Sequence, residues 1–390
     1  MTWLNLIPRS SLKGSWEGEA NLRSQMSEHD TKWMAEAVRL ARLGEGLTRP
    51  NPPVGAVVVK AGRWVGRGYH RKAGGPHAEV YALRQAGVRA KGATLYVTLE
   101  PCSTWGRTPP CTEAIIRAGI TRVVAAVADP NPRHAGKGFH LLRRAGIQVS
   151  VGVGADEARD VLAPFASAMT RGRPFVTLKL AVSMDGRIAD TAGGSQWISG
   201  PKSRTVVQAL RRRADAVMVG AGTVLKDDPS LLPRPAKGRA PLRIVVDAAG
   251  KVPAGARVFT DGAASQTLLA TTRRCLLSRR KACEAKGARV LVLPATGRGV
   301  SLTALLKSLR GLGVLHVLCE GGGELAGALL RANLVDEWVL FVAPVILGGD
   351  AVPAVGGPGW RLAKAPRLTV VETRAVGVDV MIRLRPVKPE

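Results

Sequence analysis

The amino-acid sequence predicts an α/β protein with two domains. Its 390 residues exceed the length of one typical domain, and the 46% that are hydrophobic can fill two cores. Short apolar runs alternate with segments of helical periodicity, as expected for sheets flanked by helices. Arg171-Gly-Arg-Pro174 interrupts this alternation, so we expect one domain at residues 26–171 and another at 172–390. Residues 1–25 lack periodicity, and we expect a disordered extension there, with Met1 or Met26 as the start of translation.

The first half predicts a helix, a hairpin and then alternating strands and helices. Apolar residues recur at helical spacing between Lys32 and Leu43, and Asp30 or Thr31 can cap that helix. The other expected elements are a hairpin of 54–59 and 64–69, helices from His77, from Cys111, at 138–145 and at 156–170, and strands at 94–99, 122–128 and 149–153.

The second half repeats the α/β pattern. We expect strands at 175–182, 216–220, 242–247, 267–271, 289–293, 314–319, 337–342, 368–372 and 380–383, and helices at 203–213, 274–286, 302–309 and 325–331. Glu320-Gly-Gly-Gly323 lies between a strand and a helix, where backbone amides can hold a phosphate, although a tight turn explains it equally well. No Gly-x-Gly-x-x-Gly motif with a later acidic residue supports a Rossmann domain.

The net charge of +28 raises the question of nucleic-acid binding. The basic residues are scattered, however, and no basic stretch is interleaved with aromatic residues that could stack on bases. We therefore favour a general arginine bias and a small phosphorylated substrate, and we expect no nucleic-acid partner.

No apolar run approaches the ~18 residues that cross a bilayer, so we expect no membrane association. Residues 1–30 lack the apolar segment of a signal peptide. Five cysteines make an odd number in a long chain, which favours a reducing cytoplasm over a disulfide framework.

Four residues in the first half suggest a catalytic zinc site. His77 and Glu79 begin one expected helix, Cys102 follows a strand, and Cys111 begins another helix after two prolines. The positive end of a helix lowers a thiol pKa and favours the thiolate that zinc binds. One histidine and two cysteines leave a fourth position for water, whose pKa zinc lowers. Glu79 would then move a proton from that water to a leaving amine. The alternative is that these are ordinary interior residues, which we consider the weaker interpretation.

The pattern resembles the zinc-dependent nucleobase deaminases, with eight residues rather than two between the cysteines. That insertion, 103–110, is similar to the bifunctional deaminase/reductase family of riboflavin biosynthesis. The likeness covers roughly residues 30–388 and includes Asn51-Pro-Pro-Val-Gly55, Gly66-Arg-Gly-Tyr-His70 and Asp129-Pro-Asn-Pro132. It implies a cytidine-deaminase-like three-layer α/β/α domain that removes the 2-amino group of a phosphoribosylated diaminopyrimidine. It also implies pyrimidine contacts from Asn51 and His70, and a phosphate or ring contact from Arg107 or Lys137.

The second half resembles the reductase domain of the same family through Lys179-Leu-Ala-Val-Ser-Met-Asp-Gly-Arg187, Gly194-Ser-Gln-Trp-Ile-Ser199 and Val219-Gly-Ala-Gly-Thr-Val224. The resemblance implies a dihydrofolate-reductase-like α/β fold that uses NADPH to reduce the ribosyl chain. Carried over by position, the cofactor contacts would be Ala181, Trp197, Thr223, Asp227, Gly322, Gly323, Glu324, Leu325, Ala326, Gly327 and Ala328. The substrate contacts would be Ser195, Arg211, Leu231, Arg234 and Glu320, with the arginines suited to a phosphate. Asp227 is our candidate general acid.

The chain departs from the family pattern at a few positions: Thr104-Trp105 where many members have histidine, Ala163 where asparagine is frequent, Leu232 for threonine and Ala248 for a hydroxyl residue. We expect a homo-oligomer, either a dimer or a tetramer. Two alternatives stay open: a nucleic-acid deaminase of the tRNA type, or an enzyme in which only one domain is active.

Overall fold

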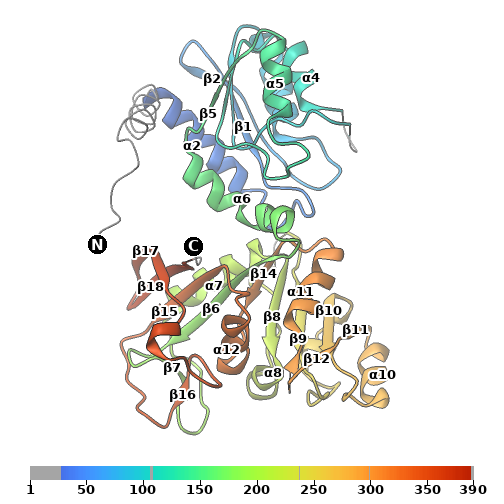
Figure 1. Ribbon diagram of the computed structural model, residues 1–390, viewed down its shortest axis with the longest axis vertical. Helices are drawn as coiled ribbons and strands as arrows, with labels where there is room; N and C mark the ends of the chain where they lie inside the picture. The colour runs from blue at the N-terminus through green and yellow to red at the C-terminus, as the bar shows by residue number, and fades with distance from the viewer. Residues whose placement is uncertain (1–27, 106–108, 237, 298, 388–390) are drawn as a thin grey trace, which may run out of the picture. The chain divides into compact units, whose positions relative to one another are not determined.

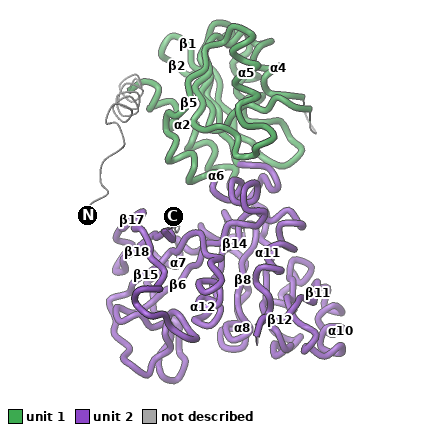
Figure 2. The backbone as a smooth tube through the Cα atoms, viewed as in Figure 1, with its two compact units in different colours: residues 1–44, 53–162 green, residues 45–52, 163–390 purple. Residues whose placement is uncertain are grey.

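The computed structural model describes residues 28–105, 109–236, 238–297 and 299–387, and the chain forms two compact units (Figure 2). Unit 1 takes residues up to Gly44 and then Pro53–Leu162, and unit 2 takes Glu45–Pro52 and everything from Ala163. The division falls inside one helix, α6 (Ala155–Thr170), which continues through Pro164. The expected disorder of residues 1–25 lies outside the described residues.

Five strands form the sheet of the described part of unit 1, in the order β2-β1-β3-β4-β5 (Figure 1). The strands are β1 (Gly55–Lys60), β2 (Arg63–Tyr69), β3 (Thr94–Val97), β4 (Arg122–Ala125) and β5 (Gln148–Val151). β1 pairs antiparallel with both β2 and β3, whereas β3, β4 and β5 are parallel. The carboxyl ends of β3 and β4 therefore lie at the same edge of the sheet.

Helices cover both faces of this sheet because successive strand residues point to opposite sides. Ala56 and Val58 of β1 pack with α3 (Ala78–Ala86), α4 (Cys111–Arg117) and α5 (Lys137–Arg144). Val57 and Val59 pack on the other side with α2 (Glu28–Arg42) and α6. A short 3₁₀ helix, η1 (Gly87–Ala90), follows α3. The expected three-layer α/β/α arrangement is confirmed.

Nine strands form the large sheet of the described part of unit 2, in the order β11-β10-β9-β8-β14-β6-β15-β18-β17 (Figure 1). They are β6 (Phe175–Val182), β8 (Ala216–Gly220), β9 (Leu242–Val246), β10 (Thr267–Thr271), β11 (Arg289–Val292), β14 (His316–Cys319), β15 (Glu337–Val342), β17 (Leu368–Val376) and β18 (Asp379–Pro386). The seven strands from β11 to β15 pair in parallel, and β18 and β17 add an antiparallel edge.

The helices of unit 2 lie on both faces of the large sheet. α11 (Leu302–Gly311) and α12 (Gly323–Arg331) pack on one apolar face. α8 (Ala221–Asp227), α9 (Arg257–Thr260) and α10 (Leu277–Ala285) pack on the other around Phe259. α7 (Pro201–Arg213) packs against β15 and β18. The smaller elements are β7 (Arg187–Ala189) paired with β16 (Val352–Pro353), β12 (Ala295–Thr296) paired with β13 (Gly299–Val300), η2 (Ala264–Gln266) and η3 (Leu362–Lys364).

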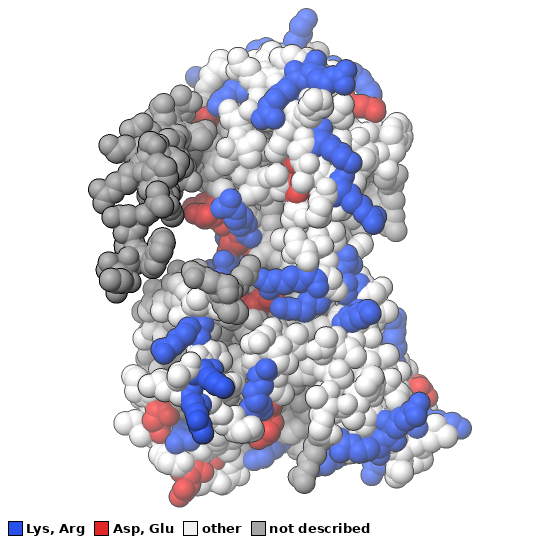
Figure 3. Space-filling model, viewed as in Figure 1, with Lys and Arg blue, Asp and Glu red and all other residues white. Residues whose placement is uncertain are grey.

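The distribution of surface charge and the composition of the helices relate to the expectations about nucleic acid and membranes. On the face drawn in Figure 3, Lys and Arg side chains occur in several separate groups with acidic side chains among them, which agrees with the scattered distribution in the sequence. No helix among the described residues combines the length and apolar composition needed to cross a membrane.

A buried ion pair joins α2 to the sheet of unit 1. The Asp30 carboxylate, 4% exposed, accepts bonds from the Tyr96 hydroxyl at 2.7 Å and from two Arg122 nitrogens at 2.9 and 2.7 Å. The hydrogen bond from Arg122 holds the pKa of Asp30 below its usual value. Because the Asp30 carboxyl has a lower pKa in the folded than in the unfolded chain, its ionised form stabilises the fold when the pH is above the unfolded-state pKa. This stabilisation is lost as the pH falls through the folded-state pKa.

Asp30→Ala should therefore lower the free energy of unfolding of unit 1 by about 3 kcal/mol at pH 7, because it leaves Arg122 without its carboxylate. Urea unfolding at pH 7 and at about pH 3 measures the effect. The difference from the natural chain should shrink at the lower pH. Asp156→Asn, at a 94% exposed side chain, is the control and should change stability by less than about 0.5 kcal/mol. Equal stability of the Asp30 variant and the natural chain at pH 7 would contradict this account.

Candidate functional site

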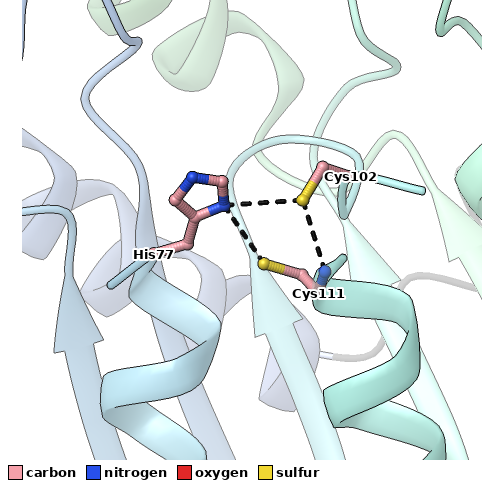
Figure 4. A group of neighbouring side chains, drawn as sticks. All are labelled: His77, Cys102 and Cys111. Atoms are coloured by element: carbon pink, nitrogen blue, oxygen red, sulfur yellow. Dashed lines mark hydrogen bonds between the residues drawn. The ribbon is translucent and has the colours of Figure 1, made fainter. Parts of the chain in front are cut away.

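The structure brings His77, Cys102 and Cys111 together at one edge of the sheet in unit 1 (Figure 4). His77 Nδ1 lies 3.2 Å from Cys111 Sγ and 3.5 Å from Cys102 Sγ. All three ligand atoms are within 4.8 Å of one another. Tetrahedral zinc with N and S ligands spaces its ligand atoms by roughly 3.6 Å. The three side chains thus fit a zinc ion with little rearrangement.

Local sequence explains why these side chains meet. His77 is the N-cap residue of α3, and Pro110 is the N-cap residue of α4, so Cys111 is the first helical residue. Cys102 follows β3 and accepts a hydrogen bond from the Cys111 amide at 3.3 Å. Helix starts carry partial positive charge, which favours thiolates at this position.

The two thiols differ in acidity. The side-chain hydrogen bond from Cys111 lowers the pKa of Cys102 to about 4, and the neighbouring His77 ring adds to the effect. The same contact raises the pKa of Cys111, and burial adds to it. Cys102 is therefore the first of the pair to become a thiolate, and a bound cation would favour ionisation of both.

Glu79 lies in the first turn of α3, two residues after His77, and its side chain is buried. Burial raises the pKa of its carboxyl, while the His77 ring opposes the rise. The Cys111 side chain also hydrogen-bonds to it. A carboxyl group beside two of the three ligands can exchange a proton with a water held there.

The other residues expected in the deaminase site have different surroundings. The His70 ring lies 5.3 Å from the His77 ring, and its Nδ1 is 3.0 Å from the Pro76 carbonyl. Burial lowers the pKa of His70, which favours the neutral ring. Asn51 lies in the segment 45–52 that groups with unit 2, and its amide donates to the Thr48 carbonyl. Lys137 is an exposed first residue of α5, and Arg107 lies outside the described residues.

Unit 2 contains a large cavity of about 1610 Å³. Its wall includes residues that follow β8, β9 and β14 (Ala221, Asp247 and Glu320), as expected for ligands at the carboxyl ends of parallel strands. Most of the expected cofactor and substrate residues line it: Ala181, Ser195, Trp197, Arg211, Thr223, Asp227, Leu231, Arg234, Glu320, Gly322, Gly323, Glu324, Leu325 and Ala328. Ala326 and Gly327 do not. Ala326 is fully buried in the core, and a side chain at Gly327 would meet the Gly356 carbonyl at 2.1 Å.

Hydrogen bonds connect the polar groups of the cavity. Arg211 forms a two-point ion pair with Glu320, with Nε–Oε1 at 2.7 Å and Nη2–Oε2 at 2.9 Å. Burial alone would raise the pKa of Glu320, but the charge and hydrogen bonds of Arg211 hold that pKa below its usual value. The Ser195 hydroxyl donates to Asp227 at 3.1 Å, and the Gly322 amide donates to the Thr223 hydroxyl at 3.2 Å.

Two basic residues in the cavity, Lys179 and Arg204, were not among the site residues expected from the sequence. Lys179 on β6 is close enough to Glu320 for their charges to interact, and burial lowers the pKa of its ammonium group. The Arg204 guanidinium lies 4.7 Å from the centre of the exposed Trp197 ring. Lys179 begins a segment that resembles the reductase family, but only the fold shows that its side chain faces this cavity. Of the departures from the family pattern, Ala248 lines the cavity, and the main-chain carbonyl of Leu232 accepts from Arg211 at 3.3 Å.

Comparisons with known proteins bear on both units. Residues 27–127 match the family described as the cytidine and deoxycytidylate deaminase zinc-binding region, and residues 174–382 match the RibD C-terminal domain. The riboflavin biosynthesis protein RibD of Aquifex aeolicus is 48% identical over 91% of this chain and 98% of its own length. The chain belongs to the RibD family. The RibD protein of Escherichia coli is 44% identical over 91% of this chain and 99% of its own.

Solved structures agree with this assignment. RibD of Acinetobacter baumannii is 38% identical with a TM-score of 0.83, and the match covers 93% of this chain and 99% of that one. A structure from Thermotoga maritima, titled a diaminohydroxyphosphoribosylaminopyrimidine deaminase/5-amino-6-(5-phosphoribosylamino)uracil reductase, is 35% identical with a TM-score of 0.81 over 92% of this chain and 99% of that one. The chain is thus a bifunctional enzyme of riboflavin biosynthesis, with a zinc-binding deaminase domain and an NADPH-dependent reductase domain.

Metal analysis of the purified protein tests the zinc ligands. The natural chain should hold about one zinc ion per chain, and Cys111→Ala should hold less than about a tenth as much, since two ligands cannot form a stable site. Cys283→Ala changes a buried cysteine of unit 2 and should keep the zinc. A folded Cys111→Ala protein with a full complement of zinc would remove this residue from the site.

Proposed function

We propose that residues 26–171 carry out the hydrolytic deamination of a phosphoribosylated diaminopyrimidine and that residues 172–390 reduce the ribosyl chain of its product. The convergence of His77, Cys102 and Cys111, with Glu79 buried beside them, carries the first assignment. The similarity to the Thermotoga maritima deaminase/reductase supports the choice of substrate. The cavity of unit 2 supports the second assignment, because most of the residues carried over for cofactor and substrate line it.

In the first reaction, His77, Cys102 and Cys111 would hold a zinc ion, which would act as a Lewis acid and lower the pKa of a bound water. Glu79 accepts a proton from that water and delivers it to the departing amine, since its carboxyl is buried within reach of the ligands. His70 and Asn51 hold the pyrimidine. His70 suits this role as a neutral ring whose orientation is fixed by the Pro76 carbonyl.

In the second reaction, NADPH supplies the hydride. Ala181, Trp197, Thr223 and Asp227, which line the cavity, contact the cofactor. Residues 322–325 and Ala328 contact its phosphates, where the first turn of α12 offers backbone amides, whereas Ala326 and Gly327 are buried away from the cavity. Ser195, Arg211, Leu231, Arg234 and Glu320 contact the substrate. Asp227, which accepts a bond from Ser195, provides the proton that accompanies the hydride.

The partners follow from the same assignment. The substrate is a small phosphorylated pyrimidine, which a basic chain attracts. We further propose a homo-oligomer, either a dimer or a tetramer, that works in the cytoplasm.

Glu79→Gln tests the deaminase assignment. Ammonia release should fall by about 10³-fold, because an amide cannot accept the proton. NADPH oxidation on 5-amino-6-(5-phosphoribosylamino)uracil, the compound named for the reductase of the Thermotoga maritima protein, should persist. Glu113→Gln, at a partly exposed side chain of α4, is the matched control and should release ammonia normally. Loss of both activities in a folded, zinc-loaded Glu79→Gln protein would contradict the model of two independent sites.

Asp227→Asn tests the reductase assignment in the opposite direction. NADPH oxidation should fall by about 10²-fold if Asp227 provides a proton, whereas ammonia release from the diaminopyrimidine should stay at the natural rate. Both activities are followed separately in one coupled assay. Unchanged NADPH oxidation would show that another group supplies the proton.

A further inference from the structure

Glu100 is a buried carboxylate that directly precedes Pro101-Cys102, which we call the zinc-ligand segment. Its side chain hydrogen-bonds to a loop that is far away in the sequence. It lies between β3 and Cys102, and only 5% of the residue is exposed. Oε2 accepts from the amides of Asp129 at 3.1 Å and Gly136 at 2.9 Å. Oε1 accepts from the amides of Gly138 at 2.8 Å and Phe139 at 3.4 Å. One side chain thus bonds both ends of the loop that follows β4.

The groups around the Glu100 carboxyl stabilise a negative charge. No basic side chain forms a salt bridge with it among the residues that the structure describes. A buried carboxylate is costly unless hydrogen bonds replace the lost water, and here four backbone amides do so. Two of these amides, of Gly138 and Phe139, belong to the first turn of α5, whose dipole also favours negative charge. An uncharged side chain of the same shape could not accept all four bonds.

The loop that Glu100 holds, residues 129–138, lies against the zinc-ligand segment. A side chain at Gly138 would meet the Pro101 carbonyl at 2.2 Å, so the two backbones are in close contact. The Glu100 amide also donates to the Val127 carbonyl at 3.0 Å, so the chain just before the loop lies beside the same segment. Within the loop, the Asn131 amide donates to Asp129 Oδ1 at 2.8 Å, which fixes the carboxyl group.

We propose that Glu100 is a positioning residue of the deaminase reaction, which fixes the loop 129–138 against the zinc-ligand segment so that this loop can hold the substrate. The proposal rests on the deaminase function proposed above. Substrate binding at the loop is tighter when the loop and its Asp129 carboxyl are in place beforehand, because ordering them during binding would reduce affinity. Glu100 itself is covered by the loop and does not touch the substrate.

Glu100→Gln is the direct test. Glutamine has the same shape, but its NH₂ group would face two amide donors in place of an acceptor oxygen. For ammonia release from the diaminopyrimidine phosphate, KM should rise by about 10- to 100-fold, with a clearly smaller change in kcat. Zinc content and NADPH oxidation on the deaminated substrate should match the natural chain. Asp156→Asn, at an exposed carboxylate of the same unit, is the control and should leave KM and kcat unchanged.

Gly138→Ala tests the same junction from the loop side. The added methyl group must push the loop away from Pro101, so it should reproduce the rise in KM. The double variant should be no worse than the poorer single variant, because both changes release one contact.

The outcomes separate the possible failures. Natural KM values in both single variants, with natural zinc content, would overturn the proposal. So would loss of zinc from Glu100→Gln together with a natural KM in Gly138→Ala, because Glu100 would then support only the metal site. If the natural chain itself released no ammonia, the proposed function would fail, and that result is distinct from an active natural enzyme with unaffected variants.

Discussion

Both active regions depend on parallel strands that end at a common edge of a sheet. Parallel pairing places the residues after each strand side by side, even when a helix separates them in sequence. In unit 1 the pairing of β3 with β4 ends at Val97 and Ala125, and the Glu100 amide still donates to the Val127 carbonyl at 3.0 Å. In unit 2 the same arrangement gathers the residues after β8, β9 and β14 around one cavity. Strand register thus determines which polar groups can act together.

The apolar core of unit 1 also sets the spacing of the zinc ligands. α3 and α4 begin with or directly after a ligand, and they pack on the same face of the sheet through Ala78, Ala82 and Ile115. Because Gly66 and Gly68 of β2 have no side chains, the backbone of α3 at Ala78 and Ala82 can approach that strand closely. The ligand geometry is therefore largely a consequence of how the apolar faces of α3 and α4 pack on the sheet. The polar contribution comes from the loops, where Glu100 joins the ends of two strands.

Sequence reasoning recovered much of the fold because periodicity and turn residues are local signals. The ranges expected for β6, β8, β10 and β15 agree with the structure, since these strands are short apolar runs between clear breaks. α8 and α9 were missed because they have only seven and four residues, which is too short for a periodic pattern. β17 continues to Val376, beyond the expected end at 372, and its pairing with β18 is irregular between Val370 and Glu372. No local sequence pattern predicts where this edge strand ends.

The sites were predictable only where chemistry is concentrated in unusual residues. His77, Cys102 and Cys111 are rare residue types at a characteristic spacing. Glu100 was missed, because glutamate is common and its four amide partners lie 29 to 39 residues further along the chain. The pair of Arg211 with Glu320 spans 109 residues and was equally invisible. Contacts between residues so far apart in the sequence depend on the order of the strands in the sheet. A single sequence indicates that order only through its resemblance to a known family.

The pairing of Arg211 changes how a phosphate can be recognised in unit 2. Nε and Nη2 of Arg211 bind Glu320, and Nη1 donates to the Leu232 carbonyl. A guanidinium group engaged in this way is rigid and largely neutralised, so it suits the uncharged polar edge of a pyrimidine better than a dianion. Arg234 is exposed at the cavity wall, and the hydrogen bonds it makes to other described residues come from its main chain. Its guanidinium is therefore better placed than that of Arg211 to meet a phosphate, and we expect selectivity for a phosphorylated substrate in the second site to depend on Arg234 more than on Arg211.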